Sequence, residues 1–227
     1  MNVLGSYGLI ILAFLITSGA QGYIAFAYKK YSGVKVKKNL TGKEAARMML
    51  DKNGLSNVKI EEVSGYLSDH YDPQAKAVRL STDNYNNASI SAVSVACHEC
   101  GHALQDKDNY HFMRFRSRLV PLVNLSTKIG YIAIMGGLLF GILNLFWLGI
   151  IFEGVMLLFQ LITLPVEFNA SSRALKKIEE YNILDSSELK QGKTMLTAAA
   201  LTYVASVLST VLELLRLILM AVSRDRN

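Results

Sequence analysis

The most informative segment of this chain reads Ala96-Cys97-His98-Glu99-Cys100-Gly101-His102-Ala103. Its histidines are spaced i and i+4, so on a helix they project from one face, one turn apart, and can reach the same metal ion. Zinc binds imidazole readily, and its catalytic sites combine three protein ligands with a water. Glu99 stands beside His98, where its carboxylate can accept a proton from that water. The segment therefore predicts one catalytic Zn²⁺ ion, held by His98 and His102, with Glu99 as general base.

The residues before the motif favour a buried helix. Residues 90–96 are small and apolar, and the helix is expected to begin near Ser89 and to continue through Gln105. A buried helix would not carry two histidines and a glutamate on one side without partners. The alternative is a surface helix whose histidines face solvent, since the five-residue motif alone also gives false matches.

The two cysteines, Cys97 and Cys100, form a C-x-x-C pair inside the motif. On a helix they lie away from both histidines, so they cannot bind the same ion, and there is no second cysteine pair to complete another site. We expect them to be small buried residues.

The composition is typical of a membrane protein with several spans. Of 227 residues, 51% are hydrophobic and 19% are charged, with a net charge of +6. The basic residues flank apolar runs instead of lining one face of a domain, so they indicate membrane topology. We therefore predict a lipid bilayer and no nucleic acid as partner.

The first apolar run, residues 3–28, has no charged side chain and is long enough to cross a bilayer core of about 30 Å. No Lys or Arg precedes it, which argues against a cleavable signal peptide. Five lysines follow within residues 29–38 and mark the cytoplasmic side.

Two later regions supply three more predicted spans. Residues 119–166 contain only Lys128 and Glu153 as charges and are long enough for two spans, with a break expected near residues 144–149. The alternative is a buried helical hairpin of a soluble protein. The last run, residues 194–222, is interrupted by Glu213 and Arg216, whose i,i+3 spacing allows them to pair; alternatively, one of them lines a substrate path.

The mixed region between the first two runs should fold as a small domain. Thr41 and Glu44 form a capping-box pattern ahead of a helix that Gly54 would end. Strands are expected near residues 58–60 and 77–80, around a turn-rich segment at 69–73. The predicted fold class is mainly α with a small α+β zincin-like domain and about four transmembrane helices. The predicted organisation is transmembrane helix 1 at 1–28, a cytoplasmic zincin-like region at 29–118, a transmembrane hairpin at 119–166, a cytoplasmic helix supplying the third ligand at 167–193, and transmembrane helix 4 with a short tail at 194–227.

The third ligand must come from outside the motif. The extended pattern H-E-x-x-H-x-x-G-x-x-H would need Gly and His where the chain has Gln105 and Asp108, and His111 lies too far along to match. The next glutamates are Glu153, inside a predicted span, and Glu167. Two spans return the chain to the side of the motif, so Glu167 is the candidate. The alternative is an interfacial carboxylate at a helix end.

The chain resembles the YugP-type membrane zinc metallopeptidases of bacteria over most of its length. The resemblance rests on five motifs in order: GYLSDHYDP at 65–73, HECGHALQ at 98–105, RSRLVP at 116–121, LPVEFNAS at 164–171 and LTAAALTYV at 196–204. It implies a multi-pass protein of the bacterial cell membrane with its active site on the cytoplasmic side. It also implies zinc binding by His98, His102 and Glu167, with Glu99 as catalytic base.

More distantly, the chain is similar to the HtpX and CAAX-protease group, whose third ligand lies in an E-x-x-A-D pattern. Glu167 and Ala170 match that pattern, but Ser171 stands where its aspartate would be. This departure leaves the partner of the histidines open. Residues that stabilise the oxyanion do not carry over, and the candidates by chemical type alone are His70, Tyr110, His111 and Arg173.

The hypothesis that follows is hydrolysis of peptide bonds in a protein or peptide substrate. A strand near residues 77–81 could align that substrate by backbone pairing. One alternative is a catalytically silent metal-binding scaffold, which would have no reason to keep Glu99. Another is a zinc transporter, which would place its ligands inside spans. The sequence identifies neither the natural substrate nor an oligomeric state.

Overall fold

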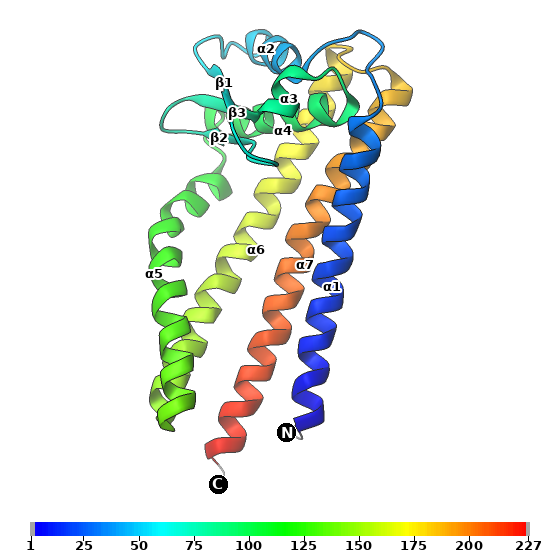
Figure 1. Cartoon of the computed structure of the whole chain (residues 1–227). Coiled ribbons are helices and arrows are strands. Elements are labelled where there is room, and N and C mark those ends of the chain that lie inside the picture. Colours follow the sequence, from blue (N-terminus) through cyan, green and yellow to red (C-terminus); the bar gives the residue numbers. More distant parts are fainter. Residues whose placement is uncertain (1–2, 226–227) are drawn as a thin grey trace. The chain divides into compact units, whose positions relative to one another are not determined.

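The computed structural model describes residues 3–225 (Figure 1). They form two compact units. The first unit contains residues 3–21, 114–165 and 201–225, and the second contains residues 22–113 and 166–200. The predicted fold class is confirmed, because the described residues are mainly helical, with one three-stranded sheet and four candidate membrane-spanning helices.

The four long helices are α1 (Val3–Ser32), α5 (His111–Phe140), α6 (Leu143–Glu180) and α7 (Ser186–Asp225). Each is long and apolar enough to cross a membrane. The break between α5 and α6 lies at residues 141–142, slightly before the predicted position. Gly141 has φ of 68°, a left-handed conformation that glycine adopts at little cost, whereas residues 144–149 continue as helix.

Within the first unit, α5 and α6 pack closely because small residues lie between them. A Cβ atom on Gly137 would lie 2.6 Å from the backbone nitrogen of Phe146. Phe146 is fully buried with Leu217 and Ala221 of α7. Glu213 and Arg216 pair as predicted, with 2.8 Å between Oε2 and Nε.

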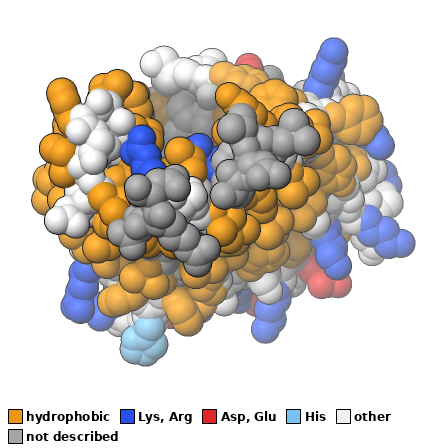
Figure 2. Space-filling model, turned by 90° about the horizontal axis from the view of Figure 1, so that it is seen from below, with side chains coloured by type: hydrophobic (Ala, Val, Ile, Leu, Met, Phe, Trp, Pro, Cys, Tyr) orange, Lys and Arg blue, Asp and Glu red, His pale blue; other side chains and the backbone are white. Residues whose placement is uncertain are grey.

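The outward surface of these helices is apolar. The large hydrophobic side chains that are most exposed there include Phe14, Tyr131, Ile151 and Phe140, the last of them 77% exposed. In Figure 2 hydrophobic side chains cover most of the visible face. An apolar outer surface of this kind suits contact with lipid.

The second unit contains α2 (Gly42–Lys52), β1 (Lys59–Val63), β2 (His70–Asp72), β3 (Ala77–Ser81), α3 (Thr82–Asn86) and α4 (Ile90–Lys107). The predicted capping box of α2 is present, and Gly54 follows the helix with φ of 69°. Strand β2 lies in the segment that the sequence predicted as turns. Helix α4 begins after Ser89, whose side chain accepts a hydrogen bond from the backbone of Ala92.

The core of this unit lies around α4. Cys97 and Cys100 are fully buried in it, as predicted, together with Met49 and Leu50 of α2. Burial raises the pKa of the Cys97 thiol, which keeps it in the neutral form. Helix α4 is thus held on its cysteine side by packing, and its histidines occupy another side.

The sheet order is β1-β3-β2, with β1 parallel and β2 antiparallel to β3. Strand β3 is therefore central, and residues 77–79 have both edges paired. The backbone N–H of Ser81 donates to Asp69. The suggestion that this strand aligns substrate by backbone pairing is therefore wrong, because its hydrogen-bonding groups are already in use.

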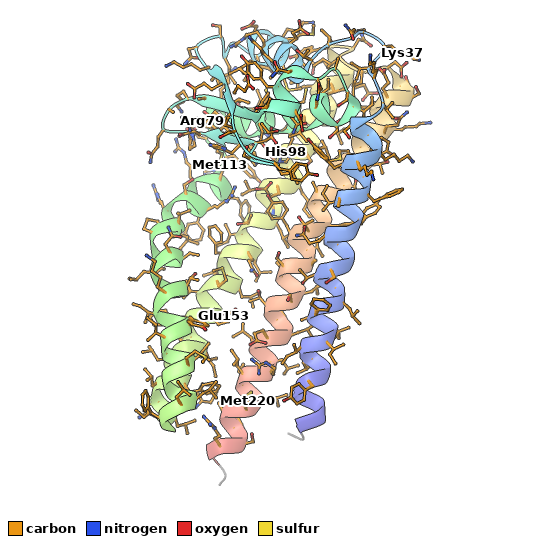
Figure 3. The ribbon with its side chains drawn as sticks, in the orientation of Figure 1. Lys37, Arg79, His98, Met113, Glu153 and Met220 are labelled. Carbon is orange, nitrogen blue, oxygen red and sulfur yellow. The ribbon has the colours of Figure 1, made fainter. Side chains whose placement is uncertain are left out.

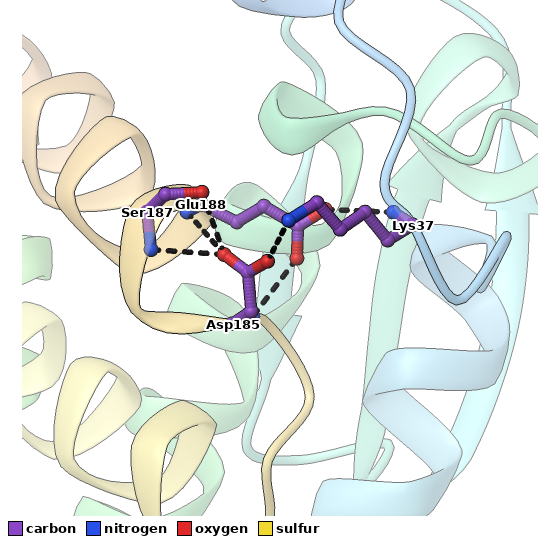
Figure 4. Close-up of polar contacts among 4 residues, drawn as sticks. All are labelled: Lys37, Asp185, Ser187 and Glu188. Carbon is purple, nitrogen blue, oxygen red and sulfur yellow. Dashed lines mark hydrogen bonds and ion pairs between the residues drawn. The ribbon is translucent and has the colours of Figure 1, made fainter.

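The start of α7 is fixed to the segment after α1 (Figure 4). The Asp185 carboxylate accepts hydrogen bonds from the backbone N–H groups of Ser187 and Glu188 and forms an ion pair with Lys37. Glu188 accepts from the backbone N–H of Lys37 at 2.7 Å and from that of Asp185 at 2.8 Å. This reciprocal capping arrangement anchors the N-terminus of α7.

Candidate metal centre

Helix α4 and the end of α6 from residue 166 onward, both in the second unit, bring three possible metal ligands together. The Nε2 atoms of His98 and His102 lie 3.3 Å and 3.5 Å from the same Glu167 oxygen, Oε2. One ligand atom from each residue falls within 4.8 Å of the others, which permits a single ion to contact all three. His102 and Glu167 are buried, and His98, labelled in Figure 3, is partly exposed.

The approach of α4 and α6 depends on two small residues. A Cβ atom on Gly101 would lie 2.4 Å from the carbonyl oxygen of Ala170, so the two backbones touch there. His98 and His102 flank Gly101 on α4, and Glu167 lies one turn before Ala170 on α6. Close contact of the backbones therefore places the carboxylate opposite both imidazoles.

Gln105 fixes the orientation of His102. Its Nε2 group donates to the backbone carbonyl of Val166 at 2.7 Å and to Oδ1 of Asn169 at 3.0 Å. Its Oε1 atom, 3.0 Å from His102 Nδ1, must then be an acceptor, so Nδ1 carries the proton. The lone pair of His102 Nε2 consequently faces Glu167.

Ser171 lies next to Nδ1 of His98, as Gln105 lies next to Nδ1 of His102. Its Oγ atom lies 3.1 Å from His98 Nδ1, so the residue that departs from the E-x-x-A-D pattern still contacts a candidate ligand. A hydroxyl can accept the Nδ1 proton, which leaves Nε2 of His98 also unprotonated toward Glu167. Being neutral, a serine makes the imidazole less basic than an aspartate would.

These residues fit a divalent cation. Two imidazole lone pairs and a carboxylate that face one another in a buried site repel unless a cation or proton lies between them. Burial alone would lower the pKa of His102, but the Glu167 carboxylate, which would accept a hydrogen bond from the protonated ring, raises it above the ordinary value. The site therefore favours a positive charge between these groups, which a divalent metal ion would supply. The donor set of two nitrogens and one oxygen is one that zinc accepts.

Glu99 lies close enough to His102 for its charge to act on that imidazole, but it is outside the group of three. It is 7% exposed. In the part of the chain that the structure describes, no donor is hydrogen-bonded to its carboxylate, and both oxygens can therefore accept protons.

The candidates chosen by chemical type have other contacts. Arg173 donates from Nε to Asn169 at 2.7 Å, pairs with Asp108, and lies over the Tyr110 ring at 5.9 Å. Asp108, rejected as a ligand, thus holds the end of α4 against α6. His70 and His111 are exposed, and Nδ1 of His70 lies 2.8 Å from the carbonyl oxygen of Ser68.

Sequence reasoning missed Gln105 and Asn169. Gln105 stands three residues after His102, one turn along the same helix face, and this spacing was an available signal. The sequence held no such signal for Asn169, because its contact with Gln105 joins positions that are far apart along the chain.

The chain is similar to known proteins over nearly its whole length. Residues 6–222 match a family model described as "Putative neutral zinc metallopeptidase". The chain is 45% identical over 220 residues to a protein of Bacillus subtilis (strain 168) described as "Putative membrane protease YugP", covering 96% of this chain and 98% of that protein. No solved structure matches.

Proposed function

The chain belongs to the neutral zinc metallopeptidase family that it matches, and from this premise we propose that it is an integral-membrane, zinc-dependent endopeptidase. The observation that carries the proposal is the convergence of His98, His102 and Glu167 beside Glu99. His98, His102 and Glu167 would hold a single Zn²⁺ ion, and Glu99 would be the general base.

When bound, zinc supplies a Lewis acid that polarises a scissile carbonyl and lowers the pKa of water. The chain's own residues do the rest. Gln105 holds the His102 proton on Nδ1, so that Nε2 of His102 is unprotonated, and the Ser171 hydroxyl can accept the Nδ1 proton of His98 in the same way. The Glu99 carboxylate accepts a proton from the attacking water and passes it to the leaving amine. Burial of the site excludes competing water, which strengthens each electrostatic contact.

The proposed location is the bacterial cell membrane, with four spans and the active site on the cytoplasmic side. The support is the set of four apolar helices and the lysines that follow the apolar part of α1. A hairpin of α5 and α6 between the motif and Glu167 is consistent with a two-span excursion that returns to the same side.

The test of catalysis compares the purified, zinc-loaded protein with its Glu99→Gln variant on an unfolded protein substrate. Wild type should cleave it, and Glu99→Gln should retain zinc but lose at least about 100-fold in rate, the typical contribution of a general base. Glu62→Gln, an exposed change on β1, is the matched control and should cleave normally. Equal rates for wild type and Glu99→Gln would refute the proposal.

A further inference from the structure

A groove of about 500 Å³ lies between α6 and α7 in the second unit, next to the candidate metal centre. Ser171 lines it and also contacts His98, so the groove begins at a residue that touches a candidate ligand. The mechanism proposed above gives the remainder of the groove no role.

The floor and the rim of the groove differ in chemistry. Leu175, Leu189 and Leu196 form an apolar floor, and the exposed Phe168 lines it one residue after Glu167. Such a floor suits a bulky apolar side chain.

At the rim of the groove, each of the two helices contributes one lysine and one hydroxyl side chain. Ser172 and Lys176 stand i,i+4 on α6, and Lys193 and Thr197 stand i,i+4 on the antiparallel α7. All four are exposed, and within residues 3–225 neither lysine forms an ion pair and neither hydroxyl has a hydrogen-bond partner. Two ammonium groups and two hydroxyls around an apolar floor are complementary to a carboxylate on an apolar segment.

A single acid also lines the groove. Glu179 lies three residues beyond Lys176, so the rim still has one more positive than negative charge. Because Glu179 would repel an acidic group, we expect the acidic group to bind beside the two lysines, on the Ser171 side of Glu179.

We propose that this groove binds the part of a substrate polypeptide that carries a bulky apolar residue close to an acidic residue. The proposal rests on the proposed peptidase function. Lys176 lies five residues beyond Ser171, which is about 7 Å along a helix, or roughly two residues of extended peptide. Counted along the substrate, its acidic residue should therefore lie roughly two to five residues from the scissile bond, on one side of that bond only.

The test uses fluorogenic peptides in which Glu or Lys is placed in turn at each of five positions on both sides of the cleaved bond. Wild type should prefer Glu by about fivefold in kcat/KM at one or two of these positions, the upper end of what one solvent-exposed ion pair contributes. The Lys176→Glu/Lys193→Glu double variant should reverse this preference toward Lys. Lys190→Glu, an exposed change on α7 outside the groove, should keep the wild-type preference.

The outcomes separate the two proposals. If no peptide or unfolded protein is cleaved, the proposed function fails. If peptides are cleaved but Glu has no preferred position, or if the double variant keeps the preference, the groove proposal is overturned while the function stands. Weaker binding of short-chain phosphatidylglycerol by the double variant, with an unchanged peptide preference, would assign the groove to lipid instead. A Lys176→Gln/Lys193→Gln variant should lose the preference without reversing it and serves if the charge-reversed protein does not fold.

Discussion

Gly101 of α4 and Ala170 of α6 lie in backbone contact, and a Cβ atom on Gly101 would approach the Ala170 carbonyl oxygen to 2.4 Å. This contact lies between the two histidines and within one turn of Glu167. The geometry of the metal centre therefore depends on the absence of a side chain at Gly101, although Gly101 itself contributes no ligand atom.

Gly101→Ala should reduce zinc binding because the helices must separate to admit the new methyl group. The gain in helix propensity, about 1 kcal/mol, does not offset a backbone clash of this kind. We expect a lower melting temperature and less than one bound zinc per chain after dialysis. Gly154→Ala in α6, where nothing lies within 4 Å of the added Cβ, is the control and should bind zinc normally. Normal zinc binding by Gly101→Ala would contradict the close-contact account.

Gln105→Ala should weaken zinc binding without removing a ligand. His102 loses the acceptor that holds the proton on Nδ1, and such partners typically contribute about 10–100-fold in metal affinity. A competition titration with a zinc chelator measures the loss. Gln105→Glu retains an acceptor for His102 and should keep more affinity than Gln105→Ala. An equal loss in both variants would mean that Gln105 acts only through the hydrogen bonds that it donates to Val166 and Asn169.

Ser171→Asp should bind zinc more tightly than wild type. A carboxylate beside Nδ1 makes His98 a more basic ligand than a hydroxyl does, whereas Ser171→Ala leaves Nδ1 without this partner. The predicted order of affinity is Ser171→Asp, wild type, Ser171→Ala, measured by the same titration. If Ser171→Ala binds zinc as tightly as wild type, the Ser171 contact does not position His98.

The anchor at the start of α7 should fail in acid. The Lys37 ion pair and the backbone N–H groups at Glu188 and Ser187 hold the pKa of Asp185 below its ordinary value. A lowered folded pKa stabilises the protein above the unfolded value, near 3.9, and this contribution is lost as pH falls through the folded value. Asp185→Asn should thus lower the melting temperature at pH 7, and the difference from wild type should shrink progressively below about pH 4. A difference that is constant from pH 7 to pH 3 would contradict this assignment.

Local patterns were sufficient to predict several elements. The capping box at Thr41 predicted α2, and the small apolar residues before His98 predicted a buried α4. The long apolar runs with few or no charges predicted the four long helices, because length and hydropathy determine whether a helix can span a bilayer. Topology also placed Glu167 on the side of the histidines, and the structure brings it to 3.3 Å from His98; its role as a ligand stays a prediction.

The features that were missed depend on contacts between distant residues. Strand β2 is only three residues long and exists because it pairs with β3, which its turn-rich sequence does not reveal. The central position of β3 likewise follows from pairing on both of its edges. Asn169 orients Gln105 across 64 positions of sequence, and no local pattern encodes such a contact.

The central claim is that His98, His102 and Glu167 together hold one zinc ion, and elemental analysis of the purified protein tests it most directly. We predict one zinc per chain in wild type and in Glu99→Gln, and a loss of most of it in His98→Ala, His102→Ala and Glu167→Ala. Wild-type protein without stoichiometric zinc, or a Glu167→Ala variant that retains a full equivalent, would contradict the account.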